Sequence, residues 1–239
     1  MTGVTQAGMT GESAVRRLIR VVAREWRHLV AAVSPKKRRE RARWQRNDGV
    51  AFLRALGITE GDTVVDFGCG PGAYSIPAAL LVGDNGLVVS VDVRARALRR
   101  LTRRARAEGI RNIRTAQHLA ELMPLLKNRS CQAILLYDVL HFMDKADRNR
   151  LYDACRGILE SGGLLSVHPK HVMEDSPLRH FRDTTVDDVV REIEESGFRL
   201  CNRMETNLWH DHGRLQGTVL NFGSADQGAA ASPNRPARR

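Results

Sequence analysis

The stretch Val64-Val-Asp-Phe-Gly-Cys-Gly-Pro-Gly72 decides the fold of this chain. A short apolar run, Thr63–Phe67, stops at three glycines in alternate positions, and a helical pattern begins at Tyr74. Glycines allow a sharp backbone turn and let a ligand approach the main chain without meeting a Cβ. Free amides at the start of the following helix can donate to a carboxylate or a phosphate. The stretch therefore predicts a strand, a ligand-binding turn and a helix.

The segments around this turn alternate between strand and helix patterns. Further strands are expected at Leu87–Val93, Ile113–Ala116, Ala133–Tyr137, Leu164–Val167, Phe198–Asn207 and Leu215–Phe222. Helices are expected at Glu12–Val33, Lys36–Leu56, Tyr74–Val82, 94–108, Asp147–Glu160 (stopped by Gly162-Gly163) and Thr185–Ser196. Strands that alternate with helices predict a mostly parallel sheet covered on both faces, and the final hairpin would add one antiparallel strand.

A second acid marks a place for a sugar. Asp92 lies 20 residues after Gly72, at the carboxyl end of the second expected strand. A carboxylate there can accept both ribose hydroxyls of a nucleoside that lies across the strand ends. The pattern therefore predicts a nucleoside-containing ligand.

Two nucleoside cofactors fit this arrangement, and Asp66 separates them. Gly68, Gly70 and Ala73 satisfy the dinucleotide pattern GxGxx(G/A), which would indicate a nicotinamide-dependent oxidoreductase. Asp66 argues against that activity, because a carboxylate two residues before the first glycine would face the pyrophosphate. S-adenosylmethionine has an α-ammonium group and no phosphate, and so suits an acid at that point.

Four motifs in this order resemble those of the class I S-adenosylmethionine-dependent methyltransferases. They are VVDFGCGPG at the turn, SVDV ending the second strand, LLYDVLH at the fourth and GGLLSV at the fifth, and the resemblance covers Gly49 to Phe222. It implies an α/β fold: a Rossmann-like, doubly wound, seven-stranded sheet with an antiparallel last strand, behind an N-terminal helical cap. It also implies S-adenosyl-L-methionine as cofactor and methyl transfer as the reaction.

The resemblance implies roles for individual residues. The cofactor-binding set it implies is Asp66, Gly68, Cys69, Gly70, Gly72, Asp92, Val93, Tyr137 and Asp138. Asp66, Gly68 and Gly70 would hold the methionine part of the cofactor, and Asp92 would hold its ribose. Tyr137 and Asp138, at the end of the fourth strand, would lie beneath the cofactor. The region Thr115–Glu121 departs from the family pattern, because no acid directly follows the third strand. The adenine amino group would instead be contacted by Gln117, by His118 or by a backbone carbonyl.

Histidines are the remaining candidates for chemistry. His141 could act as a general base, although packing at the start of a loop is the preferred interpretation. Methyl transfer needs proximity and alignment, and a base only when the nucleophile is protonated and weak. His168, His171 and His180 follow the fifth strand, but His168-x-x-His171 is no recognised zinc pattern, so no metal is expected. His210 and His212 are assigned to a solvated turn.

The positive charge is concentrated outside the expected catalytic domain. The chain has a net charge of +11, of which residues 1–46 carry +9, the tail 224–239 carries +2 and residues 47–223 sum to zero. We therefore expect a basic helical extension (1–46), a methyltransferase domain (47–223) and a disordered tail (224–239). A small-molecule acceptor is the leading hypothesis. The alternative is an RNA-modifying enzyme or a phosphate-surface binder that uses the basic segment.

Other classes of protein are disfavoured by composition. No stretch approaches about 18 uninterrupted apolar residues, so no transmembrane helix is expected. The four cysteines form no CxxC pair, which argues against a disulfide framework and favours a reducing cytoplasm. The oligomeric state is left open.

Overall fold

The computed structural model describes residues 34–126, 131–211 and 213–225, all within the compact unit Val33–Arg239. The helix expected over Glu12–Val33 and residues 226–239 of the expected tail lie outside the described residues. The three-segment division of the chain therefore stays a prediction.

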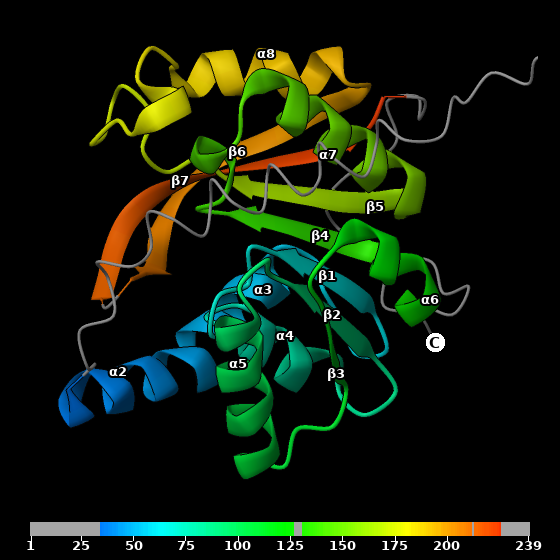
Figure 1. Cartoon of the computed structure of the whole chain (residues 1–239), viewed down its shortest axis with the longest axis vertical. Coiled ribbons are helices and arrows are strands. Elements are labelled where there is room, and N and C mark those ends of the chain that lie inside the picture. The colour runs from blue at the N-terminus through cyan, green and yellow to red at the C-terminus, as the bar shows by residue number, and fades with distance from the viewer. Residues whose placement is uncertain (1–33, 127–130, 212, 226–239) are drawn as a thin grey trace, which may run out of the picture. The chain divides into compact units, whose positions relative to one another are not determined.

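The core of the fold is a seven-stranded mixed sheet with the order β3-β2-β1-β4-β5-β7-β6 (Figure 1). Strand β7 is antiparallel to both of its neighbours, and the other pairs are parallel. This topology confirms the Rossmann-like sheet with an antiparallel last strand. The strands are β1 Thr63–Phe67, β2 Leu87–Val91, β3 Ile113–Ala116, β4 Cys131–Tyr137, β5 Leu159–His168, β6 Phe198–His210 and β7 Gly213–Ser224.

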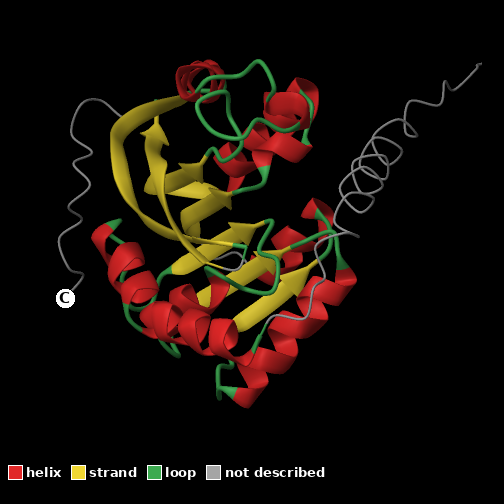
Figure 2. Cartoon of the chain, turned by 90° about the vertical axis from the view of Figure 1, so that its left-hand side faces the viewer, coloured by secondary structure: helices red, strands yellow, loops and turns green. Residues whose placement is uncertain are grey.

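Helices lie against both faces of the sheet (Figure 2). They are α2 Pro35–Arg46, α3 Asp48–Ala55, α4 Ser75–Val82, α5 Ala95–Ala107, α6 Leu122–Leu126, α7 Lys145–Ile158 and α8 Val186–Glu195. None of the helices in the described ranges is long and apolar enough to cross a membrane.

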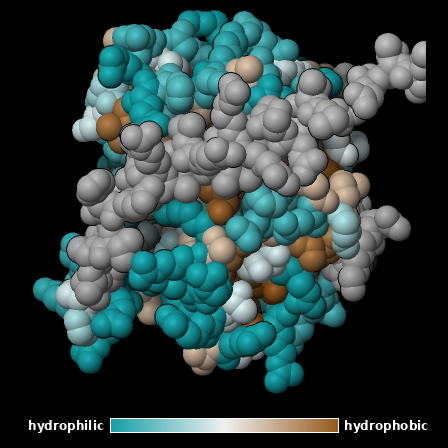
Figure 3. All heavy atoms as spheres, in the orientation of Figure 1, coloured by the Kyte–Doolittle hydropathy of each residue, from teal (hydrophilic) through white to brown (hydrophobic). Residues whose placement is uncertain are grey.

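Local sequence signals explain where several helices begin and what they bury. Thr185 and Asp188 form a capping box at the start of α8, where the helix was expected to begin. On α5, Leu98, Leu101 and Ala105 are buried. Hydrophilic residues gather over α2 and the outer side of α5 (Figure 3).

The structure corrects one expected boundary. Gly162 and Gly163 do not stop the preceding helix, because α7 ends at Ile158 and β5 begins at the next residue. Cys131 on β4 pairs with Leu159, and Ala133 pairs with Leu164, so residues 160–163 bulge out of the strand. Gly162 has a φ of 73°, a conformation that glycine adopts without a steric penalty, and the glycines therefore serve the bulge.

The basic stretch before the domain core packs against the glycine turn. Trp44 at the end of α2 is fully buried, and its ring lies 5.5 Å from that of Tyr74 and 6.1 Å from that of Trp209. The side-chain amide of Gln45 donates to the carbonyls of Gly72 and Ala73, at 2.6 and 2.9 Å. These contacts fix α2 to the turn that the sequence singled out.

The terminal hairpin is longer than the sequence indicates, and it reaches the same region. Strand β6 continues past Asn207 to His210. Near its end, the Tyr74 hydroxyl donates to the Trp209 carbonyl (3.1 Å) and accepts from its amide (3.2 Å). This pair of hydrogen bonds ties the end of β6 to the segment after the glycine turn.

Candidate active site

All three glycines of the turn have a positive φ, and two of them are also closely packed. A Cβ at Gly68 (φ 70°) would lie 2.7 Å from a methyl of Val139, and one at Gly72 (φ 83°) would lie 2.4 Å from a methyl of Leu101. At Gly70 the nearest atom to such a Cβ is the Arg94 guanidinium, at 3.6 Å. This is an ordinary contact distance, so the Arg94 side chain lies directly beside Gly70.

Asp92 lies beside Gly70 and accepts hydrogen bonds from protein donors on both carboxylate oxygens. It is buried, and its Oδ2 accepts the Gly70 amide at 2.8 Å. The backbone amide and Nε of Arg94 donate to Oδ1 at 2.8 and 3.0 Å, and its Nη2 donates to Oδ2 at 3.0 Å. A ribose can reach both carboxylate oxygens only if the Arg94 side chain moves, which its partly exposed position permits.

Asp66 lies in β1 below the turn and is almost fully buried. Its Oδ2 accepts a hydrogen bond of 2.5 Å from the Ser75 hydroxyl at the start of α4. Burial raises the pKa of Asp66 to about 7, with a further increase from the negative charge of Asp92. The two acids are thus close enough to interact, and a cation beside them would favour ionised Asp66.

The two consecutive residues at the end of β4, Tyr137 and Asp138, differ in burial. Tyr137 points into the core, where its hydroxyl lies 2.7 Å from the Ser166 hydroxyl and its ring 4.6 Å from that of Tyr74. Burial raises the pKa of Tyr137 above its ordinary value. Asp138 has a φ of 57° and lies at the strand end, where its carboxylate is 21% exposed. Tyr137 is therefore part of the core, while Asp138 is partly exposed at the strand end.

The adenine-side candidates are partly committed to other contacts. The Gln117 side chain donates to the carbonyl of Val93 at 3.3 Å, and its backbone amide donates to a Glu121 carboxylate oxygen at 3.0 Å. The contact of Val93 with Gln117 is therefore made by the Val93 backbone carbonyl.

Asp138 is the centre of a histidine cluster from three parts of the chain. His141 Nδ1 and His171 Nε2 each lie 3.7 Å from Asp138 Oδ1, and His210 Nε2 lies 3.0 Å from Oδ2. Burial raises the pKa of Asp138, but these histidines more than offset it, and the pKa lies below its ordinary value. Burial lowers the pKa of His141 to about 4, so this ring is neutral at pH 7 and a weak general base.

The expectation for His210 was wrong. Its side chain is 13% exposed, and it meets Asp138 instead of belonging to a solvated turn, because β6 extends to this residue and is tied down at Trp209. His212 lies outside the described residues. His168 directs Nδ1 to the Thr218 carbonyl at 2.8 Å, and His180 is exposed.

Sequence reasoning missed several contributors to this site. They are Gln45, Ser75, Arg94 and His210. Gln45, Ser75 and His210 contact residues that are distant in the sequence, so no local pattern could reveal them. Arg94 lies two residues after Asp92, and this proximity was a usable signal.

The comparisons with known proteins agree with this geometry. The sequence model of a family described as a methyltransferase domain matches residues 64–163, which include the glycine turn, Asp92, Asp138 and His141. Residues 64–163 of this chain are therefore similar to a methyltransferase domain.

Solved methyltransferase structures share the fold. A SAM-dependent methyltransferase from Aquifex aeolicus is 17% identical, with a TM-score of 0.59 over 89% of this chain and 98% of the other. Magnesium protoporphyrin IX methyltransferase from Synechocystis PCC 6803, solved with bound SAM, is 19% identical, with a TM-score of 0.56 over 92% of this chain and all of the other. At these identities the likeness concerns the fold.

A curated relative matches a shorter stretch. A probable cobalt-precorrin-6B C(15)-methyltransferase (decarboxylating) from Saccharolobus solfataricus is 40% identical over 60 residues, which are 25% of this chain. The matched stretch covers only 30% of the length of that relative.

Proposed function

We propose that this methyltransferase transfers the methyl group of S-adenosylmethionine to a nucleophilic atom of a small-molecule acceptor. The observation that carries the proposal is the pair of buried acids beside the glycine turn: Asp92 accepts the Gly70 amide, and Asp66 lies in β1 just before the turn. An uncharged or anionic group would gain little from two buried acids, whereas a ligand with a cationic end and ribose hydroxyls would satisfy both.

The residues of the turn fit that cofactor in a definite orientation. Asp92 would accept the ribose hydroxyls once Arg94 has moved, and Asp66 would stabilise the α-ammonium group through the turn. The bound cofactor supplies an electrophilic methyl group on a sulfonium. The protein then has to hold the acceptor in line with that methyl group and exclude water, so proximity and alignment supply most of the rate enhancement.

Two observations support a small acceptor. Residues 47–223 sum to zero net charge, so the domain itself offers no excess attraction for a polyanion. Two of the similar proteins are named for tetrapyrrole substrates, precorrin and magnesium protoporphyrin. A reducing compartment such as the cytoplasm is part of the proposal, because Cys69, Cys131, Cys155 and Cys201 are all free thiols.

A second candidate, methylation of RNA, is favoured by one feature. An open cavity of about 740 Å³ lies along α5 and is lined by Arg99, Arg103 and Arg106 among others. Together with the +9 charge of residues 1–46, this surface could bind phosphates.

Radiolabelled methyl transfer to cell extract, separated afterwards into small molecules, RNA, lipid and protein, tests the proposal. We expect label in the small-molecule fraction. Label confined to RNA would replace the proposal with the second candidate. Absence of label in every fraction, together with no calorimetric binding of S-adenosylhomocysteine, would overturn both.

The raised pKa of Asp66 predicts proton release on cofactor binding. Free Asp66 has a pKa of about 7 against 3.8 for the ordinary carboxyl, so between these values the folded protein holds a proton that the unfolded chain lacks. This contribution to the free energy of unfolding falls as pH rises through that window. An ammonium group beside Asp66 lowers its pKa, so S-adenosylhomocysteine should release a fraction of a proton at pH 6.5 and bind more tightly at pH 8 than at pH 6.

Calorimetry in two buffers of different ionisation enthalpy measures that release. Asp66→Asn should bind with the same apparent enthalpy in both buffers, because it has no proton to lose. Equal apparent enthalpies for the unaltered protein would contradict a role for Asp66 beside the ammonium group.

A further inference from the structure

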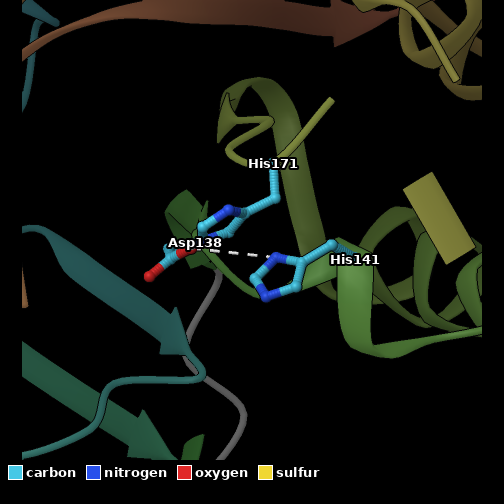
Figure 4. Close-up of side chains that lie close together, drawn as sticks. All are labelled: Asp138, His141 and His171. Carbon is cyan, nitrogen blue, oxygen red and sulfur yellow. Dashed lines mark ion pairs between the residues drawn. The ribbon is translucent and has the colours of Figure 1, made fainter. Parts of the chain in front are cut away.

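We propose that Asp138, His141 and His171 form a binding site for a divalent transition-metal ion (Figure 4). Asp138 directly follows β4, His141 lies in the short helical turn Leu140–Phe142, and His171 lies in the loop after β5. Their side chains converge, and one ligand atom from each lies within 4.8 Å of the other two.

The separations within this cluster suit a shared cation better than direct contacts. His141 Nδ1 and His171 Nε2 are both 3.7 Å from Asp138 Oδ1, which is too long for a hydrogen bond. Ligands on a tetrahedral ion with bonds of about 2.1 Å lie about 3.4 Å apart. A contraction of a few tenths of an ångström would therefore bring each histidine nitrogen to the separation from Asp138 Oδ1 that ligands of one ion have.

The polar atoms that face the centre of the cluster lack partners. Asp138 Oδ1 and His141 Nδ1 are buried without a hydrogen bond among the described residues, and such atoms are rare in folded proteins. His171 Nδ1 lies 2.8 Å from the Ser176 carbonyl, which can only accept, so Nδ1 carries the hydrogen. His171 Nε2 therefore presents a lone pair to Asp138 Oδ1. A cation between these two acceptors would satisfy both.

The surroundings have the form expected around metal ligands. The contact of His171 with the Ser176 carbonyl is the outer contact that fixes the tautomer of a ligating histidine. His210 Nε2 lies 3.0 Å from Asp138 Oδ2, beside the second oxygen of the carboxylate. Asp138 and His171 also have positive φ values, 57° and 67°, a strained conformation that proteins retain mainly at functional sites.

The donor set indicates the class of ion. Two imidazoles and a carboxylate suit Zn²⁺, Fe²⁺ or Co²⁺, whereas Mg²⁺ and Ca²⁺ prefer oxygen donors. Three protein ligands leave a coordination position open, as in catalytic zinc sites. Asp138 and His171 remain 21% and 16% exposed, which leaves a path for the ion and for one outside ligand.

The open position also indicates the acceptor, and this step rests on the proposed function. Strand β4 pairs with β1 from Val64 to Phe67, so the cluster and the glycine turn follow neighbouring strand ends. A hydroxyl oxygen bound to the ion would lose its proton to solvent. The new O–CH₃ bond would then form as the S–CH₃ bond breaks, which leaves S-adenosylhomocysteine. The acceptor class is thus a small molecule with a hydroxyl, and a weak base such as His141 is not needed.

Metal binding is tested directly on the full chain after treatment with a chelator and dialysis. Titration with Co²⁺ should give visible absorption bands at about one equivalent, which Zn²⁺ should then displace. His171→Ala and Asp138→Asn should lose this spectrum, and His210→Ala should weaken Co²⁺ binding by about 10–100-fold. His180→Ala is the matched control, because His180 is exposed in the same loop region, and should bind as the unaltered protein does.

Thermal unfolding of each variant shows whether it remains folded. Absence of a Co²⁺ spectrum in the unaltered protein, or an unchanged spectrum in folded His171→Ala, would overturn the metal site. Binding of S-adenosylhomocysteine is measured separately on the metal-free protein. Cofactor binding without metal binding removes only the metal site, whereas metal binding without cofactor binding removes the proposed function and the acceptor assignment.

Discussion

Replacing Asp92 with alanine is expected to weaken binding of S-adenosylhomocysteine by at least about 100-fold. Hydrogen bonds to a buried carboxylate contribute about 1.5–3 kcal/mol each, and each 1.4 kcal/mol corresponds to about tenfold in affinity. Asp92 can offer two such bonds to a ribose. Displacement of Arg94 from the same oxygens offsets part of the gain, so the expected loss stays near the lower end of the sum. Calorimetric titration measures the change.

A second variant separates cofactor contacts from the shape of the turn. Asp92 also accepts the Gly70 amide, so alanine could disturb the turn itself. Asp92→Asn keeps one acceptor oxygen for that amide and should bind with an affinity between those of the alanine variant and the unaltered protein. Asp84→Ala, at an exposed position of the turn 83–86, is the control and should bind normally. Full affinity in both Asp92 variants would show that the ribose lies elsewhere.

Glu192→Ala is expected to lower the free energy of unfolding by about 3–5 kcal/mol. Arg148 and Glu192 form a buried bidentate ion pair between α7 and α8, with both N–O distances at 2.6 Å. The Tyr152 hydroxyl also donates to Glu192, and Arg148 donates to the Met143 carbonyl. Removing Glu192 leaves a guanidinium buried without its counter-charge, which is why the cost is high. Denaturant titration measures the change.

The same helix supplies the control for this prediction. Glu195 pairs with Lys145 at 3.6 Å, but both side chains are more than 60% exposed. Glu195→Ala should therefore change the free energy of unfolding by less than about 1 kcal/mol. The double variant Arg148→Met/Glu192→Leu should recover part of the loss, because it removes both charges together. A Glu192→Ala protein as stable as Glu195→Ala would contradict this account of the pair.

Much of the fold was predictable because its signals are local. The apolar run Thr63–Phe67, the glycines after it and the capping box at Thr185 each act within a few residues, and the structure has the elements they predict. The expected stop at Gly162-Gly163 failed for a long-range reason. Those glycines lie in a bulge of β5, which forms because the pairing of β5 with β4 shifts register there.

The candidate site also has one part that the sequence predicts and one part that it does not. The cofactor side could be predicted, because Asp66, the glycines and Asp92 follow consecutive strands of one βαβ unit, where the spacing fixes which strand ends meet. The histidine side could not. Asp138 meets His171 and His210 only because β5 and the end of β6 converge on the edge where β4 stops.

The amino-acid sequence by itself determined the sheet, the glycine turn and the pair of acids, because hydrophobic periodicity and backbone freedom act between near neighbours in the chain. Only the tertiary structure decided that a carboxylate and three histidines come together. Such contacts depend on strand order, on the length of the terminal hairpin and on burial, which are properties of the packed molecule.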